Sequence, residues 1–110
     1  MGSTYHVKVT EQAEEHLREI VWYIIVQLKA PKAALHFLDA FEQEVLSLSQ
    51  FPGRFALVDE EPWHSQGVHK MILKNFLVYF LIDETVKKVQ VFAAIYGGRD
   101  QGWQLSRLEF

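Results

Sequence analysis

The fold is decided by one stretch, residues 13–48, which reads AEEHLREIVWYIIVQLKAPKAALHFLDAFEQEVLSL. Its apolar side chains recur at steps of three and four residues, the spacing of an amphipathic helix. They form two stripes, the first made of Ala13, Leu17, Ile20, Val21, Ile24 and Leu28 and the second of Ala34, Phe37, Leu38, Phe41, Val45 and Leu48. Pro31 separates the stripes, because proline ends one helix and suits the first turn of the next. The link is so short that the two helices, each about 18 residues long, must run antiparallel.

Period-two patterns on both sides of this hairpin predict strands. Residues 5–9 alternate between apolar and polar side chains, and Thr10 is suited to cap the first helix. After the hairpin, residues 54–66 are expected to form a loop, and strands follow at residues 68–74, 76–82 and 88–96. We therefore expect residues 1–110 to form one α+β domain with a four-stranded antiparallel sheet. The N-terminal strand belongs to this sheet, and the antiparallel helical hairpin packs on it.

Composition excludes several classes of protein. The 110 residues are 49% hydrophobic and 23% charged, enough for a core and for solubility, and they include no cysteine, so disulfides and thiolate chemistry are excluded. The net charge of −3 argues against a general nucleic-acid binder, although a local basic patch can sit on an acidic protein. No secretory signal is visible, and the longest apolar run, residues 76–82, is far too short to span a bilayer. We expect a soluble cytoplasmic protein without a membrane partner.

Signatures of metal and cofactor sites are weak. His64 and His69 form a pair without the third ligand that a protein zinc site needs. Gly97 and Gly98 lack the helix and the lysine that follow the glycines of a phosphate-binding loop. We expect no metal and no cofactor.

Three short segments in the C-terminal half resemble a known superfamily when they are taken in order. They are GVHKM at residues 67–71, KNFLVY at 74–79 and IYGGRD at 95–100. They are similar to the glycine-led strand, the aromatic-rich central strand and the closing arginine–aspartate of the RelE/ParE toxins. Phe51-Pro52 also resembles the Leu/Phe-Pro that ends the second helix in that superfamily. The resemblance covers about residues 5–100.

The resemblance implies the toxin of a type II toxin–antitoxin system, the kind associated with plasmid stabilisation and growth inhibition, neutralised by a cognate antitoxin. ParE-like members inhibit DNA gyrase by binding, whereas RelE-like members are ribosome-dependent mRNA endonucleases, or mRNA interferases. Many nuclease members have arginine where this chain has Leu77, and their catalytic Tyr or His has no clear counterpart after Arg99. The ParE-like interpretation therefore leads. An mRNA interferase and a non-toxic relic that only binds its antitoxin stay open as alternatives, so whether the chain is an enzyme is also open.

RNA cleavage through the 2′-hydroxyl needs a base, an acid and a cation. Side chains of suitable chemistry are Arg54, His69, Lys70, Lys74, Tyr96 and Arg99. Of these, His69, Tyr96 and Arg99 are the catalytic candidates, and Lys70, Lys74 and Arg99 are the candidates for binding the target. Strand alternation places His69 on one face and Lys70 with Lys74 on the other. Each also has a plainer interpretation, as a solvated lysine, a rim histidine, a packed tyrosine or an arginine in a structural ion pair.

Trp22, Tyr23 and Ile25 lie beyond the first apolar stripe. An amphipathic antitoxin segment needs an apolar groove on its toxin, so these residues are the candidates for antitoxin binding. The alternatives are that they pack on the sheet or in a homodimer. The expected assembly is therefore a toxin–antitoxin hetero-oligomer or a homodimer.

Overall fold

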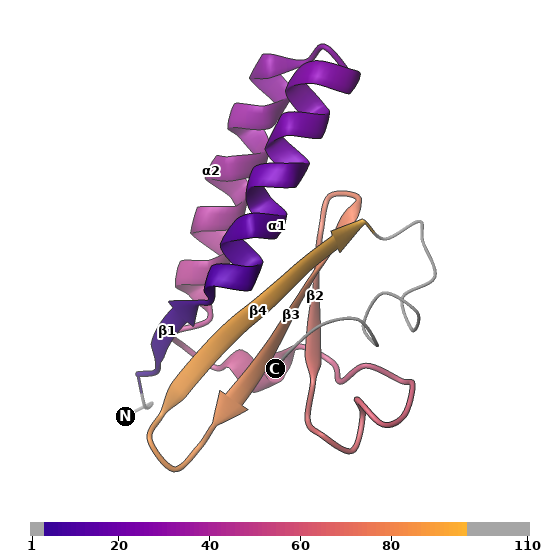
Figure 1. The fold of residues 1–110 in the computed structure, drawn as a ribbon. Coiled ribbons are helices and arrows are strands. Elements are labelled where there is room, and N and C mark those ends of the chain that lie inside the picture. The colour runs from indigo at the N-terminus through magenta and orange to yellow at the C-terminus, as the bar shows by residue number, and fades with distance from the viewer. Residues whose placement is uncertain (1–3, 97–110) are drawn as a thin grey trace.

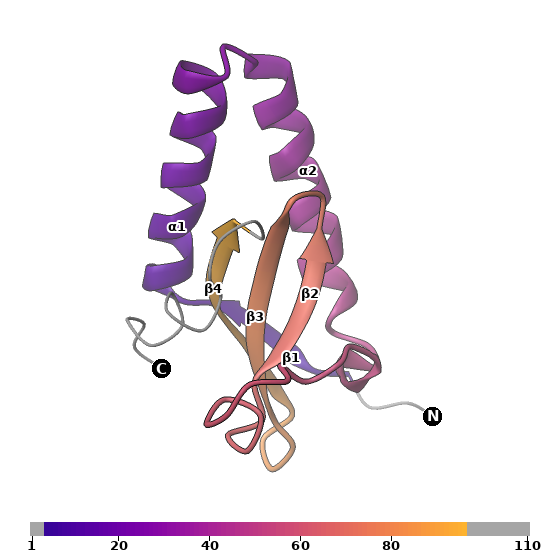
Figure 2. The same cartoon turned by 90° about the vertical axis from the view of Figure 1, so that its right-hand side faces the viewer.

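The computed structural model describes residues 4–96, and Figure 1 shows a helical hairpin rising from a sheet. In chain order its elements are β1 (His6–Val9), α1 (Glu11–Trp22), the π-helix η1 (Tyr23–Gln27), α2 (Pro31–Ser47), the 3-10 turn η2 (Pro52–Arg54), β2 (His69–Leu73), β3 (Phe76–Asp83) and β4 (Lys88–Tyr96). The antiparallel helical hairpin, the loop after it and the three following strands are confirmed. The tip of the hairpin extends beyond the strand ends in both views (Figures 1 and 2).

The first helix is capped as its sequence predicts but ends in a wider turn. The Thr10 hydroxyl accepts a hydrogen bond from the Ala13 backbone N–H at 3.2 Å. At the other end the Leu28 N–H donates to the Tyr23 carbonyl at 3.2 Å, and Lys29 stops the helix at φ 52°. A π-turn adds a residue to the repeat, so Leu28 no longer falls below Ile24. The prediction that Leu28 belongs to the buried stripe is therefore wrong, and this side chain is 55% exposed.

The sheet is mixed, and its strand order is β1-β4-β3-β2. β2, β3 and β4 form an antiparallel meander, but β1 pairs in parallel with β4, with Val7 opposite Val89. The expectation of a purely antiparallel sheet is corrected on this point. The physical reason is the number of reversals: α2 brings the chain back to the end where β1 began, and β2 starts from there. β4 runs the same way as β2, and therefore the same way as β1.

Each face of the sheet carries its own core cluster. The hairpin covers one face, which we call the helix-side face, and packs Ile24, Phe37 and Phe41 against Val78 and Phe80. On the opposite face, which we call the loop-side face, the loop after η2 covers a second cluster made of Val58, Val68, Tyr79, Phe92, Ala93 and Ile95. The central strand β3 is thus buried on both sides, as its apolar sequence predicts.

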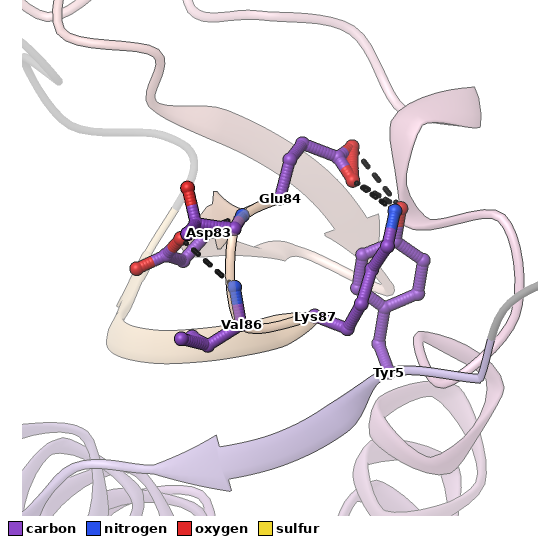
Figure 3. A network of polar contacts seen from close by, with 6 residues as sticks. Tyr5, Asp83, Glu84, Val86 and Lys87 are labelled. Atoms are coloured by element: carbon purple, nitrogen blue, oxygen red, sulfur yellow. Dashed lines mark hydrogen bonds and ion pairs between the residues drawn. The ribbon is translucent and has the colours of Figure 1, made fainter.

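The base of the fold is tied together by exposed polar side chains (Figure 3). The Tyr5 hydroxyl donates to the Glu84 carboxylate in the β3–β4 turn, and Lys87 forms an ion pair with Glu84 at 3.2 Å. Asp83 Oδ1 accepts from the Thr85 N–H at 3.0 Å and shapes the same turn. The hydrogen bond from Tyr5 lowers the pKa of Glu84 and raises that of the tyrosine. The network fixes the start of the chain to the turn that precedes β4.

Within residues 4–96, none of the helices has the length and apolar content that crossing a membrane requires.

Candidate functional site

The loop-side face carries Lys70, one of the three residues that sequence reasoning linked to the target. Lys70 pairs with Tyr79 and Ile72 with Leu77 across β2 and β3, and directly paired residues point to the same side of a sheet. Burial raises the pKa of Tyr79 to about 12, so this phenol is not an acid or base near neutral pH. Leu77 is half-buried against the second cluster. The middle of this face is therefore apolar packing with Lys70 at its edge.

His69 lies on the other side of the same strand. Its Nδ1 is 2.8 Å from the Phe55 carbonyl oxygen, so this nitrogen carries the proton and donates. The ring stacks on Phe80, with centroids 5.2 Å apart and planes inclined by 11°. The β2–β3 register runs without a shift from His69 to Leu73, so His69 and Lys70 face opposite sides, as the alternation predicts. Packing and this hydrogen bond account for His69.

Lys74 does not share the strand face of Lys70. β2 ends at Leu73, and Lys74 takes φ 55° in the turn before β3. The prediction that one strand presents both lysines on one face is therefore wrong. The reason is local, because a tight hairpin turn consumes the residue that the period-two pattern assigned to the strand. Lys74 is exposed in the β2–β3 turn, and Lys70 is half-buried.

Arg54 has a structural role that sequence reasoning missed. Its Nη1 donates to the carbonyl oxygens of Gln50 at 2.6 Å and Phe51 at 3.0 Å, and its Nη2 donates to the Ser47 hydroxyl at 2.9 Å. The guanidinium also lies 4.5 Å from the centre of the Phe55 ring. Carbonyls at a helix C-terminus lack partners within the helix, and a cation there is favoured. A basic residue shortly after a helix end was the available signal.

The last two sequence candidates are Tyr96, the last described residue, and Arg99, which follows the described residues. Tyr96 closes β4 opposite Phe76, and its side chain falls outside the described residues, as does Arg99.

Each histidine of the pair His64 and His69 directs one ring nitrogen to a backbone carbonyl oxygen. His64 directs Nδ1 to the Val58 carbonyl oxygen at 2.9 Å, and His69 uses its Nδ1 for Phe55. In the part of the chain that the structure describes, no three His, Asp or Glu side chains are close enough to hold an ion.

The outer face of α1 and η1 presents apolar surface. Trp22 is 57% exposed, Tyr23 46% and Ile25 42%, so these side chains do not pack on the sheet. Trp22 and Tyr23 line an open depression of about 500 Å³, whose other walls are Glu15, Arg18 and Glu19. Glu15 and Arg18 form an ion pair beside it. Large apolar side chains framed by charges are typical of a surface that binds another protein.

Comparison with known proteins identifies the class of protein that this fold and surface belong to. The family model described as "ParE toxin of type II toxin-antitoxin system, parDE" matches residues 7–101. Comparison with curated protein sequences gave no significant match. The family match over residues 7–101 shows that the chain is a RelE/ParE superfamily toxin. Within that superfamily it belongs to the ParE toxin family of type II toxin–antitoxin systems.

Solved structures share the fold at low sequence identity. The chromosomal ParDE system from P. aeruginosa contains a chain with a TM-score of 0.67 and 24% identity, covering 84% of this chain and 96% of that one. A chain of the RelBE2 toxin–antitoxin complex from Mycobacterium tuberculosis gives 0.61 and 17%, covering 86% and 92%. A chain of the archaeal RelE–RelB complex from Pyrococcus horikoshii OT3 gives 0.53 and 19%, covering 88% and 99%.

Proposed function

We propose that this ParE-family toxin inhibits DNA gyrase by binding it, without catalysing a reaction of its own, and that a cognate antitoxin neutralises it in the cytoplasm. The observation that carries the proposal is the separation of His69 from Lys70 by the thickness of the sheet. A nuclease needs its general base and its cation on the same side of one scissile phosphate. The match to the ParE toxin model over residues 7–101 supports the same choice.

The environment of Leu77 gives further support. This position corresponds to an arginine in many nuclease members of the superfamily, and here it is a half-buried leucine opposite Ile72 and Ile95. A preorganised cation near the phosphate raises the cleavage rate by about 10²–10³. An apolar residue at this position therefore lacks a large part of the rate enhancement that a nuclease needs. Binding a protein target needs no such cation. Lys70 and Lys74, with Arg99 beyond the described residues, are the proposed target contacts.

The antitoxin is assigned to the outer face of α1 and η1. Trp22, Tyr23 and Ile25 supply exposed apolar side chains on one helical segment, which suits an amphipathic segment laid against it. This surface and the proposed target contacts lie on different elements. A hetero-oligomer with the antitoxin is the proposed resting state.

Inhibition of gyrase supercoiling by the purified chain tests the function. We expect relaxed plasmid to accumulate as the toxin concentration rises. Arg99→Ala should weaken inhibition more than Lys88→Ala, since Arg99 belongs to the family-like ending and Lys88 begins β4 after a turn. Unchanged supercoiling at the highest soluble concentration would reject gyrase as the target. Equal losses in the two variants would reject Arg99 as a specific contact.

A further inference from the structure

β2 is the outermost strand on one side of the sheet among residues 4–96 (Figure 2). The loop that precedes β2 covers the first part of its outer edge. The Lys70 N–H donates to the Ala56 carbonyl oxygen at 3.0 Å, and the Val58 N–H donates to the Val68 carbonyl oxygen at 2.8 Å. These bonds show which backbone groups at this edge point away from β3.

The outer edge becomes open at Ile72. Backbone groups alternate in direction along a strand, so the N–H and carbonyl of Ile72 point outward like those of Lys70, two residues earlier. Within residues 4–96, the hydrogen bonds that join this edge to the loop stop at Lys70. The Ile72 side chain is 72% exposed. The open edge therefore presents one backbone donor, one backbone acceptor and one large apolar side chain.

A lysine lies on each side of Ile72 in the chain. Lys70 is half-buried on the same face of the sheet, and Lys74 is exposed in the β2–β3 turn. In the part of the chain that the structure describes, neither lysine belongs to an ion pair. The open edge is thus flanked by two positive charges, although the chain as a whole has a net charge of −3.

We propose that an extended acidic segment of the target protein adds to this edge as a further strand, an inference that rests on the proposed function and names the chemistry of its partner. An added strand donates to the Ile72 carbonyl oxygen and accepts from its N–H. The partner residue opposite Ile72 lies on the same face of the sheet and is expected to be apolar. The residue two positions away meets Lys70 and is expected to be acidic. Lys74 in the turn favours a second acidic residue at the other end of the segment.

The same charges argue against a second copy of this chain as the occupant. A twofold axis through Ile72 would pair two β2 edges antiparallel and place Lys70 of each copy opposite Lys74 of the other. Like charges opposite each other destabilise a pair of strands. Lysines on an edge strand are also a common means of preventing such pairing. An acidic segment makes both contacts favourable.

NMR titration of the isotope-labelled chain with a defined peptide tests the edge without the target. The probe is acetyl-Thr-Asp-Thr-Val-Thr-Asp-Thr-amide, and its control is the same peptide with lysine in both aspartate positions. We expect the acidic peptide to shift the Ile72 amide resonance and slow its hydrogen exchange, with a Kd of about 0.1–1 mM that rises with salt. An Ile72 amide that does not respond, or equal binding of the lysine peptide, would overturn the proposal.

Ile72→Pro tests whether the target uses this edge. Proline removes the outward N–H without removing a hydrogen bond to β3, and edge strands tolerate proline at such positions. Ile72→Val also makes the side chain smaller but keeps the N–H. Gyrase inhibition should therefore be weaker by about 10-fold or more in Ile72→Pro than in Ile72→Val. Antitoxin capture should be equal for the two variants, since that partner is assigned to α1 and η1, and circular dichroism should show that both are folded.

Failure of this proposal and failure of the proposed function give different results. If the unaltered chain does not inhibit gyrase, gyrase is not the target, and the peptide titration decides whether the edge accepts an acidic strand. If the unaltered chain inhibits gyrase and the two folded variants inhibit equally, the function stands and strand addition is rejected. Antitoxin capture that is lost only in Ile72→Pro would assign the edge to the antitoxin and would also reject the proposal.

Discussion

The backbone N–H of Ala94 donates a hydrogen bond to Nδ1 of His16 across 3.2 Å. β1 ends at Val9, so within residues 4–96 the edge of β4 that follows Val91 has no strand beside it. The side chains of α1 take over, because Gln12 Nε2 donates to the Phe92 carbonyl at 2.8 Å and His16 follows one helical turn later. The first helix thus continues the edge pairing that β1 begins, and it places two polar side chains where a strand would have been.

The contact between His16 and Ala94 makes stability depend on pH. Burial lowers the pKa of His16 below its ordinary value of 6.5, and the imidazole must be neutral for Nδ1 to accept. Between the folded-state pKa and 6.5 the unfolded chain therefore binds more protons. We expect this contribution to be complete above about pH 6.5 and to be lost as the pH falls from there toward the folded-state pKa. Urea unfolding across this range measures it.

His16→Asn is the control for that titration. The asparagine Oδ1 sits at the position of Nδ1 and accepts a hydrogen bond at every pH. We expect the variant to lose the part of the pH dependence that the wild-type chain shows below 6.5. Identical pH profiles for the two proteins would show that His16 does not titrate as described.

Phe41→Ala tests the packing of the hairpin on the sheet. Phe41 is buried in the helix-side cluster, 6.4 Å from the Phe37 ring centre, so its removal leaves a cavity. The free energy of unfolding should fall by about 3–5 kcal/mol. Leu46→Ala on the same helix is the matched control, since Leu46 is 64% exposed, and it should cost less than about 0.5 kcal/mol. A loss below about 1 kcal/mol for Phe41→Ala would contradict the placement.

Trp22→Asp tests the assignment of the antitoxin to α1. The substitution puts a carboxylate on the exposed outer face of α1 and η1, and we expect it to abolish capture of the antitoxin in a pull-down. The circular dichroism spectrum should stay unchanged because Trp22 contributes little to the core. Leu46→Asp changes an equally exposed leucine on α2 and should bind normally. Retained capture by Trp22→Asp would place the antitoxin elsewhere.

Arg54→Ala separates structure from target binding. The arginine caps α2 through Gln50, Phe51 and Ser47, so we expect the free energy of unfolding to fall by about 1 kcal/mol. Gyrase inhibition at equal concentrations of folded protein should not change. Lost inhibition with unaltered stability would make Arg54 a target contact instead of a cap.

The spacing of apolar residues along the chain predicts those parts of the fold that depend on residues close in sequence. Steps of three and four residues gave the hairpin, and Pro31 gave its position. The apolar run of β3 predicted its burial on both sides. Strand alternation also predicts that His69 and Lys70 lie on opposite faces, as the register of β2 and β3 has them.

Features that depend on backbone geometry, on backbone partners or on the path of the whole chain could not be predicted in this way. The wide turn at Tyr23 broke the stripe at Leu28, since periodicity assumes one helix type throughout. The parallel pairing of β1 follows from the path of the whole chain. Arg54 looked like a free cation because its partners are backbone carbonyls, which the sequence does not distinguish. His16 was missed because nothing in a helical pattern points to the edge of a strand.

The measurement that tests the central claim most directly is primer extension on translating ribosomes with the purified toxin. A toxin that works by binding, with His69 held against Phe55 and Leu77 packed in the sheet, should leave the message intact at concentrations that inhibit gyrase. Discrete cleavage in the codon-occupied site, lost in His69→Ala or Arg99→Ala, would contradict the account and make the chain a ribosome-dependent endonuclease.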